Sequence, residues 1–295
     1  MNKDNKKLVK IVKDNNLIQG KYHLNPLEQK FIYKLIEYIQ ANNFIEREVE
    51  LTFENFLKGF KQVINKRITK QEFKNFIEGI QDKRIILYSE REKFIRTQWF
   101  KISGDLNYNT LTLEIDKDVF NYIHNLHTKF TELSLESLYK FKKFYSMRIY
   151  ELLKQWSCKG ETKIIGFELN YLREILGLKD KKAYETFANF RARILEPTKE
   201  EINNNSELII DYNFKTEHKK IVGIYFEVFD SGIEKKKIKE DIPFFVSSKK
   251  EQKNNNGNLC LGIEKDNNNK HTFNNFDQRI YDYDSLEKKL LGWNE

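Results

Sequence analysis

Residues 133–156 read LSLESLYKFKKFYSMRIYELLKQW, and the two halves of the chain are best understood from this stretch outward. Its apolar residues recur at steps of three, four or seven, the spacing of one buried helical face; they are Leu135, Leu138, Tyr145, Ile149, Leu152 and Trp156. Ser134 can cap the start, and Lys142, Lys143 and Arg148 fall among the apolar positions. The pattern predicts one long helix ending near Trp156. A core helix with a merely solvated basic flank satisfies the same periodicity.

The length, composition and net charge of the chain indicate a basic protein of one large or two modest domains. The chain has 295 residues, of which 39% are hydrophobic, enough for each domain to bury its own core. A net charge of +8 and a pI near 9.1 point to a polyanionic partner, nucleic acid before a membrane surface. Charge alone is weak support for this, because many basic proteins bind nothing acidic.

Several chemistries lack their sequence signals. No apolar run approaches the ~18 residues of a membrane span, and the basic N-terminus has no signal-peptide core. Cys158 and Cys260 are far apart with no CxxC, which predicts a reduced, cytoplasmic protein without structural zinc. His124 and His127 have the wrong spacing for a rolling-circle metal site, and no GxxxxGK[ST] is present. We therefore expect a non-enzyme with no cofactor, no metal and no catalytic residues.

The first half of the chain predicts three helices followed by a hairpin. The predicted elements are a capped helix from Asn25 to about Asn42, a strand at Glu48–Leu51, a helix from Thr52 to Phe60, a helix opened by the capping box Thr69–Glu72, hairpin strands Arg84–Ser89 and Lys93–Ile102 around Glu90–Glu92, a strand at Leu111–Ile115 and a helix from Asp116 to Leu126. On the third helix, Lys70, Gln71 and Lys74 lie opposite the apolar face. This order is that of a winged helix, although a generic α+β domain would show the same pattern.

The second half repeats the plan. It contains a strand at Lys163–Phe167, a helix at Glu168–Leu176 stopped by Gly177, a third helix at Lys181–Asn203 and a hairpin of Leu208–Phe214 with Ile221–Phe229. In the third helix, Tyr184, Phe187, Phe190, Ile194 and Leu195 share one apolar arc, and Lys182, Glu185, Thr186, Asn189 and Arg193 lie opposite. Arg and Asn can bond guanine and adenine in a major groove, so this polar face has the chemistry of a base reader. A solvated helix face is the alternative.

Two residues of this helix need separate treatment. Arg191 falls inside the apolar arc, so it is expected either to pair with an acid or to reach phosphate from the helix edge. Pro197 is expected to kink or end the regular helix, because it lacks the N–H that the helix ladder needs.

Five segments in order carry a family resemblance. They are Leu17-Ile18 with Tyr22-His23-Leu24 and Glu28-Gln29-Lys30; Tyr145-Ser146-Met147-Arg148-Ile149-Tyr150-Glu151-Leu152-Leu153; Leu172-Arg173-Glu174-Ile175-Leu176-Gly177; Tyr184 with Arg191-Ala192-Arg193-Ile194-Leu195-Glu196-Pro197 and Glu201-Ile202-Asn203; and Ile224-Tyr225-Phe226-Glu227-Val228. Across roughly residues 7–230 the chain closely resembles the plasmid replication initiators with two winged-helix domains, the iteron-binding Rep family.

The resemblance implies an α+β protein with tandem winged-helix domains related by a pseudo-two-fold axis and followed by a flexible C-terminal tail. The expected domains are 1–132, for DNA contact and dimerisation; 133–233, the main DNA reader; and 234–295, a low-complexity tail. The tail regains aromatics from Phe273 to Trp293, where a short amphipathic helix is expected, either as a docking peptide or folded back on the body.

The resemblance also implies roles for particular residues. Base readers would be Lys182, Thr186, Asn189 and Arg193 in the second domain, with Lys70, Gln71 and Lys74 as the first domain's counterparts. Phosphate contacts would come from Lys142, Lys143, Ser146, Arg148, Lys181 and Arg191. The implied partners are double-stranded origin DNA, a second copy through the N-terminal domain, host replication proteins (helicase or initiator) and chaperones, with no membrane and a plasmid-associated, cytoplasmic location.

Two other classes of function remain open at this point. A winged-helix transcriptional repressor without initiation activity would use the same DNA contacts. A protein–protein scaffold would use the basic faces for solubility alone.

Overall fold

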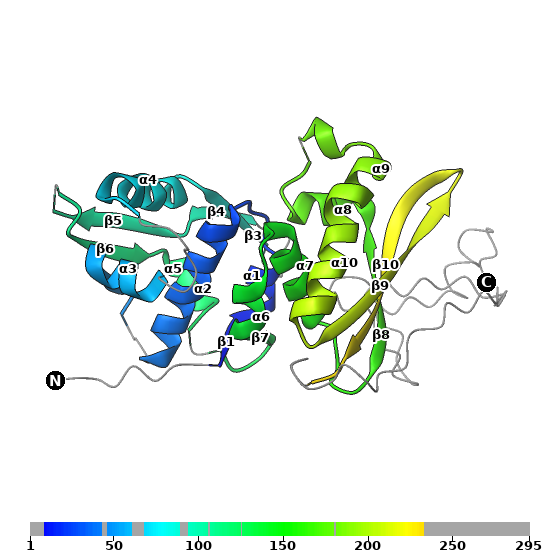
Figure 1. Cartoon of the computed structure of the whole chain (residues 1–295), viewed down its shortest axis with the longest axis horizontal. Helices are drawn as coiled ribbons and strands as arrows, with labels where there is room; N and C mark the ends of the chain where they lie inside the picture. The colour runs from blue at the N-terminus through cyan, green and yellow to red at the C-terminus, as the bar shows by residue number, and fades with distance from the viewer. Residues whose placement is uncertain are drawn as a thin grey trace, which may run out of the picture.

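The computed structural model describes residues 9–42, 46–60, 68–88, 94–105, 107–124, 126–179 and 181–232. The predicted turn Glu90–Glu92 and the predicted tail, with its helix near 273–293, lie outside the described residues. Two groups of helices and strands lie side by side, with α6 and α7 between them (Figure 1). We call residues 26–115 the first module and residues 144–230 the second module.

The three-stranded sheets of the two modules have the same topology. The first module contains α2 (Pro26–Ala41), β2 (Glu48–Thr52), α3 (Phe53–Phe60), α4 (Lys70–Gln81), β5 (Phe100–Gly104) and β6 (Thr110–Ile115). The second contains α7 (Phe144–Lys154), β8 (Thr162–Glu168), α8 (Leu169–Ile175), a 3₁₀ turn (Lys182–Tyr184), α9 (Phe187–Phe190), a π-helical turn (Arg191–Leu195), α10 (Glu196–Asn205), β9 (Leu208–Glu217) and β10 (Lys220–Asp230). The three-stranded antiparallel sheets run β2-β6-β5 and β8-β10-β9. Each therefore places its last strand in the centre, which confirms the predicted tandem winged-helix fold.

The wing of the first module is not the hairpin that the sequence predicts. The predicted strand Lys93–Ile102 divides at Trp99 into β4 (Phe94–Gln98), which pairs with β3 (Arg84–Tyr88), and β5, which pairs with β6. Trp99 is buried, and its ring meets that of Tyr22 edge-on at 4.9 Å. Because this side chain is held in the core at the division, the strands on either side join different sheets. The hairpin β5–β6 is the wing, and β3–β4 is an additional hairpin before it.

The predicted long helix from Leu133 to Trp156 is also wrong. Residues Phe130–Ser134 form β7, Leu135–Lys140 form α6, and α7 starts only at Phe144. Phe141 is buried with extended backbone and packs on Tyr150 at 5.3 Å between ring centroids. The backbone N–H groups of Lys142 and Lys143 donate to the carboxylate of Glu201 in α10, at 2.9 and 3.3 Å. A tertiary acceptor thus replaces the helical one.

Segments outside the two repeats complete the body. They are β1 (Lys10–Asp14), α1 (Asn15–Ile18) and α5 (Lys117–Asn121), together with β7 and α6. Strand β1, which the sequence reading missed, pairs antiparallel with β7. Helix α5 ends at Asn121 rather than at the predicted Leu126, and the next carbonyl, that of Tyr122, accepts the N–H of Asp14 at 3.0 Å. The N-terminal segment therefore sets the end of α5.

One face of α7 carries charges that are completely buried. Lys13 Nζ lies 2.6 Å from Glu151 Oε1, and Arg148 pairs with the other oxygen of the same carboxylate. Arg148 also donates to Tyr22 Oη and to the carbonyls of Ile18 and Gly20, at 2.8, 2.7 and 2.9 Å. Burial lowers the pKa of Lys13 to about 8. Burial would raise the pKa of Glu151, but Lys13 and Arg148 outweigh it and hold that pKa low.

This cluster corrects two predicted phosphate contacts. Arg148 and Ser146 are both 0% exposed. Both terminal nitrogens of the Arg148 guanidinium, Nη1 and Nη2, donate inside the cluster, and Ser146 Oγ faces Thr198 Oγ1 of α10 at 3.4 Å. Neither side chain is accessible to a phosphate group in this structure. The helical periodicity placed Arg148 among apolar residues, and the structure shows that it shares their buried environment.

The opposite face of α7 is tied to the sheet of the second module. Tyr150 Oη donates to Glu207 Oε1 at 2.8 Å, and Lys154 Nζ lies 3.0 Å from the same oxygen. Lys154 also pairs with Asp230 at the end of β10. Burial alone would lower the pKa of Lys154, but Glu207 and Asp230 outweigh it and raise that pKa. Helix α7 is thus held by fully buried ion pairs on one side and by partly buried ion pairs on the other.

We predict that Glu151→Ala lowers the free energy of unfolding by about 3–5 kcal/mol, because it leaves two buried cations without their carboxylate. Glu136→Ala is the matched control, since it removes a partly exposed (i, i+4) pair with Lys140 and should cost less than about 1 kcal/mol. Urea denaturation of the purified variants measures both. Equal losses would show that the cluster adds no more than a surface pair.

Asp230 supplies a pH-dependent test. Burial would raise its pKa, but Lys154, Ser157 and the Gly232 N–H lower it below the ordinary 3.8. A carboxyl with a lowered pKa stabilises the fold above the ordinary value, and that contribution is lost as the pH falls through the folded-state pKa. Wild type and Asp230→Asn should therefore differ most in unfolding free energy at pH 7, and the difference should shrink as the pH falls below 3.8. A difference that does not change with pH would contradict this assignment.

Candidate nucleic-acid interface

The predicted base readers of the second module are exposed but do not lie on one regular helix. Lys182 is in the 3₁₀ turn, Thr186 precedes α9, Asn189 is in α9, and Arg193 is in the π-helical turn. All four are exposed. Phe190, Ile194 and Leu195 are buried, as the helical arc predicted. The predicted helix from Lys181 thus begins only at Phe187.

The π-helical turn explains how the helix passes Pro197. A proline cannot donate to the carbonyl four residues back, and its ring collides with that carbonyl. Here the Glu196 N–H instead donates to the carbonyl of Arg191, five residues back. The extra residue in this turn carries the chain directly into α10 rather than ending the helix. Because Arg193 lies within the π-helical turn, this turn sets the direction in which the Arg193 side chain points.

Arg191 is paired with an acid, one of the two outcomes expected from the sequence. Its Nε lies 2.9 Å from Glu196 Oε1, which also accepts the hydroxyl of Tyr212 at 2.7 Å. The hydrogen bond from Tyr212 and the charge of Arg191 hold the pKa of Glu196 below its usual range. Arg191 remains about half exposed, so its guanidinium joins the helix to the wing at the surface.

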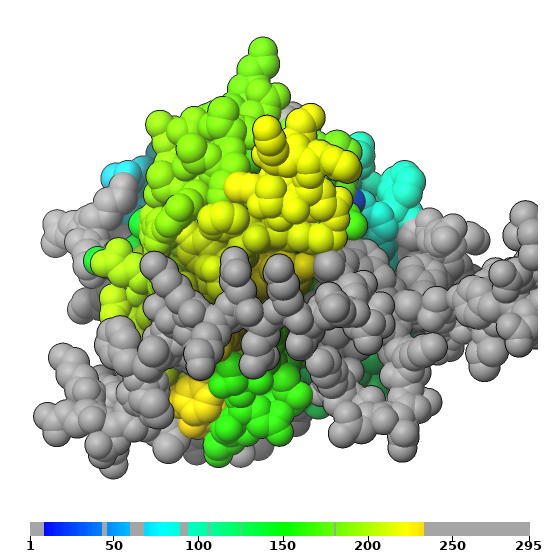
Figure 2. Space-filling view, turned by 90° about the vertical axis from the view of Figure 1, so that its right-hand side faces the viewer, coloured from blue at the N-terminus to red at the C-terminus, as the bar shows by residue number. Residues whose placement is uncertain are grey.

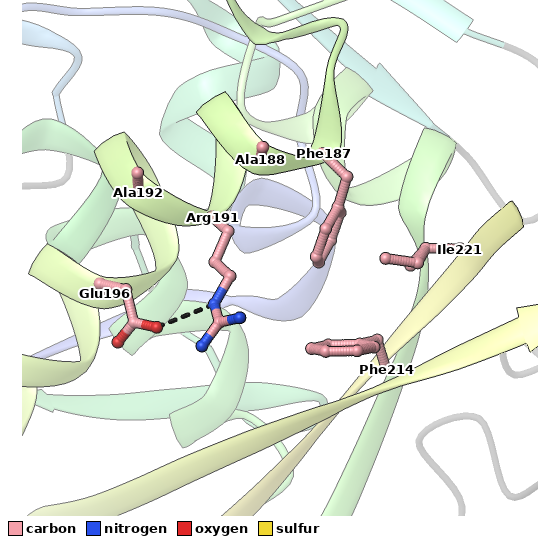
Figure 3. Close-up of a pocket in the computed structure, with 7 residues that line it drawn as sticks. All are labelled: Phe187, Ala188, Arg191, Ala192, Glu196, Phe214 and Ile221. Carbon is pink, nitrogen blue, oxygen red and sulfur yellow. Dashed lines mark hydrogen bonds and ion pairs between the residues drawn. The ribbon is translucent and has the colours of Figure 1, made fainter.

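A hollow of about 520 Å³ lies between this helix and the wing (Figure 3). Phe187 on the helix and Phe214 on β9, in the β9–β10 hairpin that is the wing of this module, line it side by side, with ring centroids 5.4 Å apart. The ion pair of Arg191 and Glu196 lies at one end. We call residues 182–195 the α9 region. Figure 2 shows the α9 region and the β9–β10 hairpin together at the upper part of this side of the molecule. Helix and wing therefore form one continuous surface.

The predicted readers of the first module lie at the start of α4. Lys70 and Gln71 are exposed and Lys74 is half-buried. Lys70 Nζ contacts Asn109 Oδ1 near the tip of the wing, and Lys74 Nζ lies 4.9 Å from the centroid of the Tyr108 ring. The capping box on Thr69 and Glu72 is formed as predicted. In Figure 1, α4 and α9 lie along the same upper edge of the molecule.

The remaining phosphate candidates divide by location. Lys142 and Lys143 are exposed at the bend before α7. Lys181 lies at the junction of the modules, where its Nζ is 3.1 Å from Nε2 of His23 in the segment before α2. Burial, with the charges of Lys181 and Lys83, lowers the pKa of His23. No site role for His23 or Lys83 follows from the sequence, because only the docking of the modules brings them to Lys181.

Within the described part of the chain, no group of three or more His, Cys, Asp or Glu side chains could hold a metal ion. No helix among the described residues is both long enough and apolar enough to cross a membrane.

Tandem winged helices define a class of nucleic-acid-binding protein, and comparisons with known proteins identify the family within it. The model of the initiator replication protein WH1 domain matches residues 10–154, and that of the initiator Rep protein WH2 domain matches residues 168–228. The chain therefore belongs to the Rep family of replication initiator proteins, and the resemblance noted in the sequence is confirmed.

One solved structure in the comparison has the same fold. The crystal structure of Pi initiator protein in complex with iteron DNA is 19% identical, with a TM-score of 0.56 over 75% of this chain and 97% of that chain. Two structures of RctB domains 2 and 3 are 13% and 12% identical, with TM-scores of 0.39 and 0.36, each over 69% of this chain and 81% of the other.

The module junction can be tested at Gly177, whose φ of +67° favours glycine and whose added Cβ would lie 2.9 Å from His23 Cβ. Gly160 is the control, because its φ is +80° and a Cβ there would meet nothing within 4 Å. Gly160→Ala should cost about 1–2 kcal/mol from backbone strain alone. Gly177→Ala should cost more, because the His23 side chain must also move. Equal losses in thermal or urea unfolding would contradict the close packing at the junction.

Proposed function

We propose that this protein binds directly repeated origin sequences (iterons) in double-stranded DNA and initiates plasmid replication from them. The observation that carries the proposal is that both modules present exposed polar faces, on α4 and on the α9 region, along one edge of the molecule. Two such faces suit two major grooves on the same side of one duplex. The Pi protein, which shares this fold, was crystallised with iteron DNA.

The proposed roles follow the accessibility of the side chains. Lys182, Thr186, Asn189 and Arg193 read base edges in the second module, and Lys70, Gln71 and Lys74 read them in the first. Phosphate contacts come from Lys142, Lys143 and Lys181, with Arg191 contributing its exposed guanidinium edge. Ser146 and Arg148 are left out, because both are buried.

We further propose the finer steps of the activity. Binding and bending of AT-rich DNA, without hydrolysis, helps to open the origin, and host helicase or initiator proteins are then recruited. A dimer formed through residues 1–132 represses the protein's own gene, and residues 133–233 form the main reader. Chaperones are further partners. The protein acts in the cytoplasm on its plasmid and is not an enzyme.

The readers can be separated from the phosphate contacts by mutation. Arg193→Ala should cost about 1–3 kcal/mol of specific binding and relax the preference at one base pair. Lys142→Ala should weaken all sequences alike and reduce the slope of log K against log salt by about 0.9. Lys140→Ala is the control for Lys142→Ala, because Lys140 is already paired with Glu136. Binding titrations on a selected duplex and its single-base variants measure these effects. An unchanged base preference in Arg193→Ala would reject that reader.

A transcriptional repressor is the second candidate, because it would use the same two DNA-reading faces. A plasmid that carries the gene's flanking repeats but no other replicon decides between them when the protein is supplied in trans. Replication supports the initiator, and repression of a reporter without replication supports the repressor. Absence of any salt-sensitive DNA binding would reject both and favour a scaffold.

A further inference from the structure

At the junction between the modules, the side chain of Lys181 contacts that of His23. Lys181 Nζ lies 3.1 Å from His23 Nε2, and no carboxylate among the described residues lies within ion-pair distance of that ammonium. The neighbouring lysines differ: Lys21 and Lys179 both pair with Glu174, at 2.8 and 3.3 Å. Lys181 therefore carries a charge that the surrounding described residues leave unneutralised.

His23, in the segment before the first module, is itself held in place by the second module. Its ring packs against Phe144 and Tyr145 at the start of α7, with centroids 4.9 and 5.9 Å away. The backbone of Gly177 approaches its Cβ so closely that a side chain there would collide. A neutral imidazole accepts one N–H of the Lys181 ammonium at Nε2 and leaves the other two N–H groups available. The imidazole thus orients the ammonium without neutralising it.

A second cation strengthens the positive field at this point. Lys83, two residues after the end of α4, is paired with Glu28 of α2. Its charge still acts on the neighbouring groups: burial and Lys83 lower the pKa of Lys181, and burial, Lys181 and Lys83 together outweigh the opposing charge of Glu28 and lower the pKa of His23. Both shifts disfavour additional positive charge in the unliganded protein. A bound anion would relieve this repulsion.

The location indicates which anion. The segment leading into α2 reaches the upper edge of the molecule between α4 and the α9 region (Figure 1). If the two faces occupy successive major grooves, about 34 Å apart, the backbones flanking the intervening minor groove must cross this junction. Phosphate oxygens are then the anionic groups that pass His23 and Lys181. This step rests on the function proposed above.

We propose that Lys181, positioned by His23 and supported by the charge of Lys83, binds one DNA backbone phosphate at the junction of the two modules. Lys181 comes from the second module and His23 from the segment before the first, so the site is complete only when the modules are docked as they are here. The contact therefore adds affinity only when both modules lie on one duplex in this arrangement. His23 is a positioning residue and Lys181 the binding residue.

Methylphosphonate substitution tests the contact directly. A duplex selected by the full-length protein from a random-sequence pool is remade with one neutral methylphosphonate at a time across the spacer between the two contacted grooves. Wild-type affinity should fall about tenfold at one or two adjacent positions, as expected for losing a charge-assisted hydrogen bond. Lys181→Ala should bind the native duplex about tenfold more weakly, with a salt slope smaller by about 0.9, and should be insensitive at those positions.

Lys179→Ala is the matched control. It lies on the same loop, its side chain is largely exposed, and it is already paired with Glu174. It should keep the wild-type methylphosphonate profile and change affinity less than about twofold.

The role of His23 is tested by two substitutions, one that removes its hydrogen-bond acceptor and one that keeps an acceptor. His23→Leu should lose most of the methylphosphonate sensitivity, because leucine cannot accept from Lys181, and His23→Gln should retain it through its amide oxygen. Thermal unfolding of both variants confirms that each is folded, so a purely structural role of His23 would not separate them.

The outcomes distinguish this site from the proposed function. If Lys181→Ala keeps the wild-type profile, or if no spacer phosphate matters to a wild type that binds DNA, the junction site is overturned and the proposed function stands. If the wild type selects and binds no duplex, both are overturned.

Discussion

The carboxylate of Glu151 lies between the ammonium of Lys13 and the guanidinium of Arg148, fully buried, and the arrangement of the two modules depends on this contact. A buried ion is costly to separate from its partners, because the remaining charge has no water to solvate it. Any displacement of helix α7 relative to β1 or to residues 18–22 would therefore break these contacts. The opposite side of α7 is held by Glu207 in the same way. The contacts on the two sides of α7 thus fix how the two modules are placed relative to each other.

That constraint bears on function because each module alone offers only a small reading surface. The α4 and α9 regions lie on one edge of the molecule, and their separation is set by the contacts of α7 and by the junction at His23. A rigid spacing between two readers lets a monomer select two grooves together. The affinity of the second contact then adds to that of the first through a high effective concentration. Directly repeated sites are the DNA targets that suit such an arrangement.

The two modules share a strand order but use their charged residues differently. In the first, Lys70 and Lys74 contact the wing at Asn109 and Tyr108, so helix and wing are already joined. In the second, Arg191 joins helix to wing through Glu196 and Tyr212, while Asn189 and Arg193 stay exposed. The second module thus presents more unengaged polar groups, in keeping with its proposed role as the main reader. The first has its readers partly committed to internal contacts.

Local sequence determined the elements whose causes are local. The capping boxes at Asn25 and Thr69, the stop at Gly177, the buried arc of Phe190 and Ile194, and the repeated helix–strand–helix–helix–hairpin order all follow from neighbouring residues. The family motifs likewise lie within short segments.

Tertiary structure alone decided the break at Phe141, the burial of Arg148, the division of a strand at Trp99 and the meeting of His23 with Lys181. In each case the deciding partner is distant in the chain: Glu201 for the break, Lys13 and Tyr22 for Arg148, Tyr22 for Trp99. A helical period reports which residues share a face, but it cannot report whether that face meets solvent, DNA or a buried carboxylate. The free energy that decides between them comes from desolvation and pairing, and these depend on packing that only the folded chain defines.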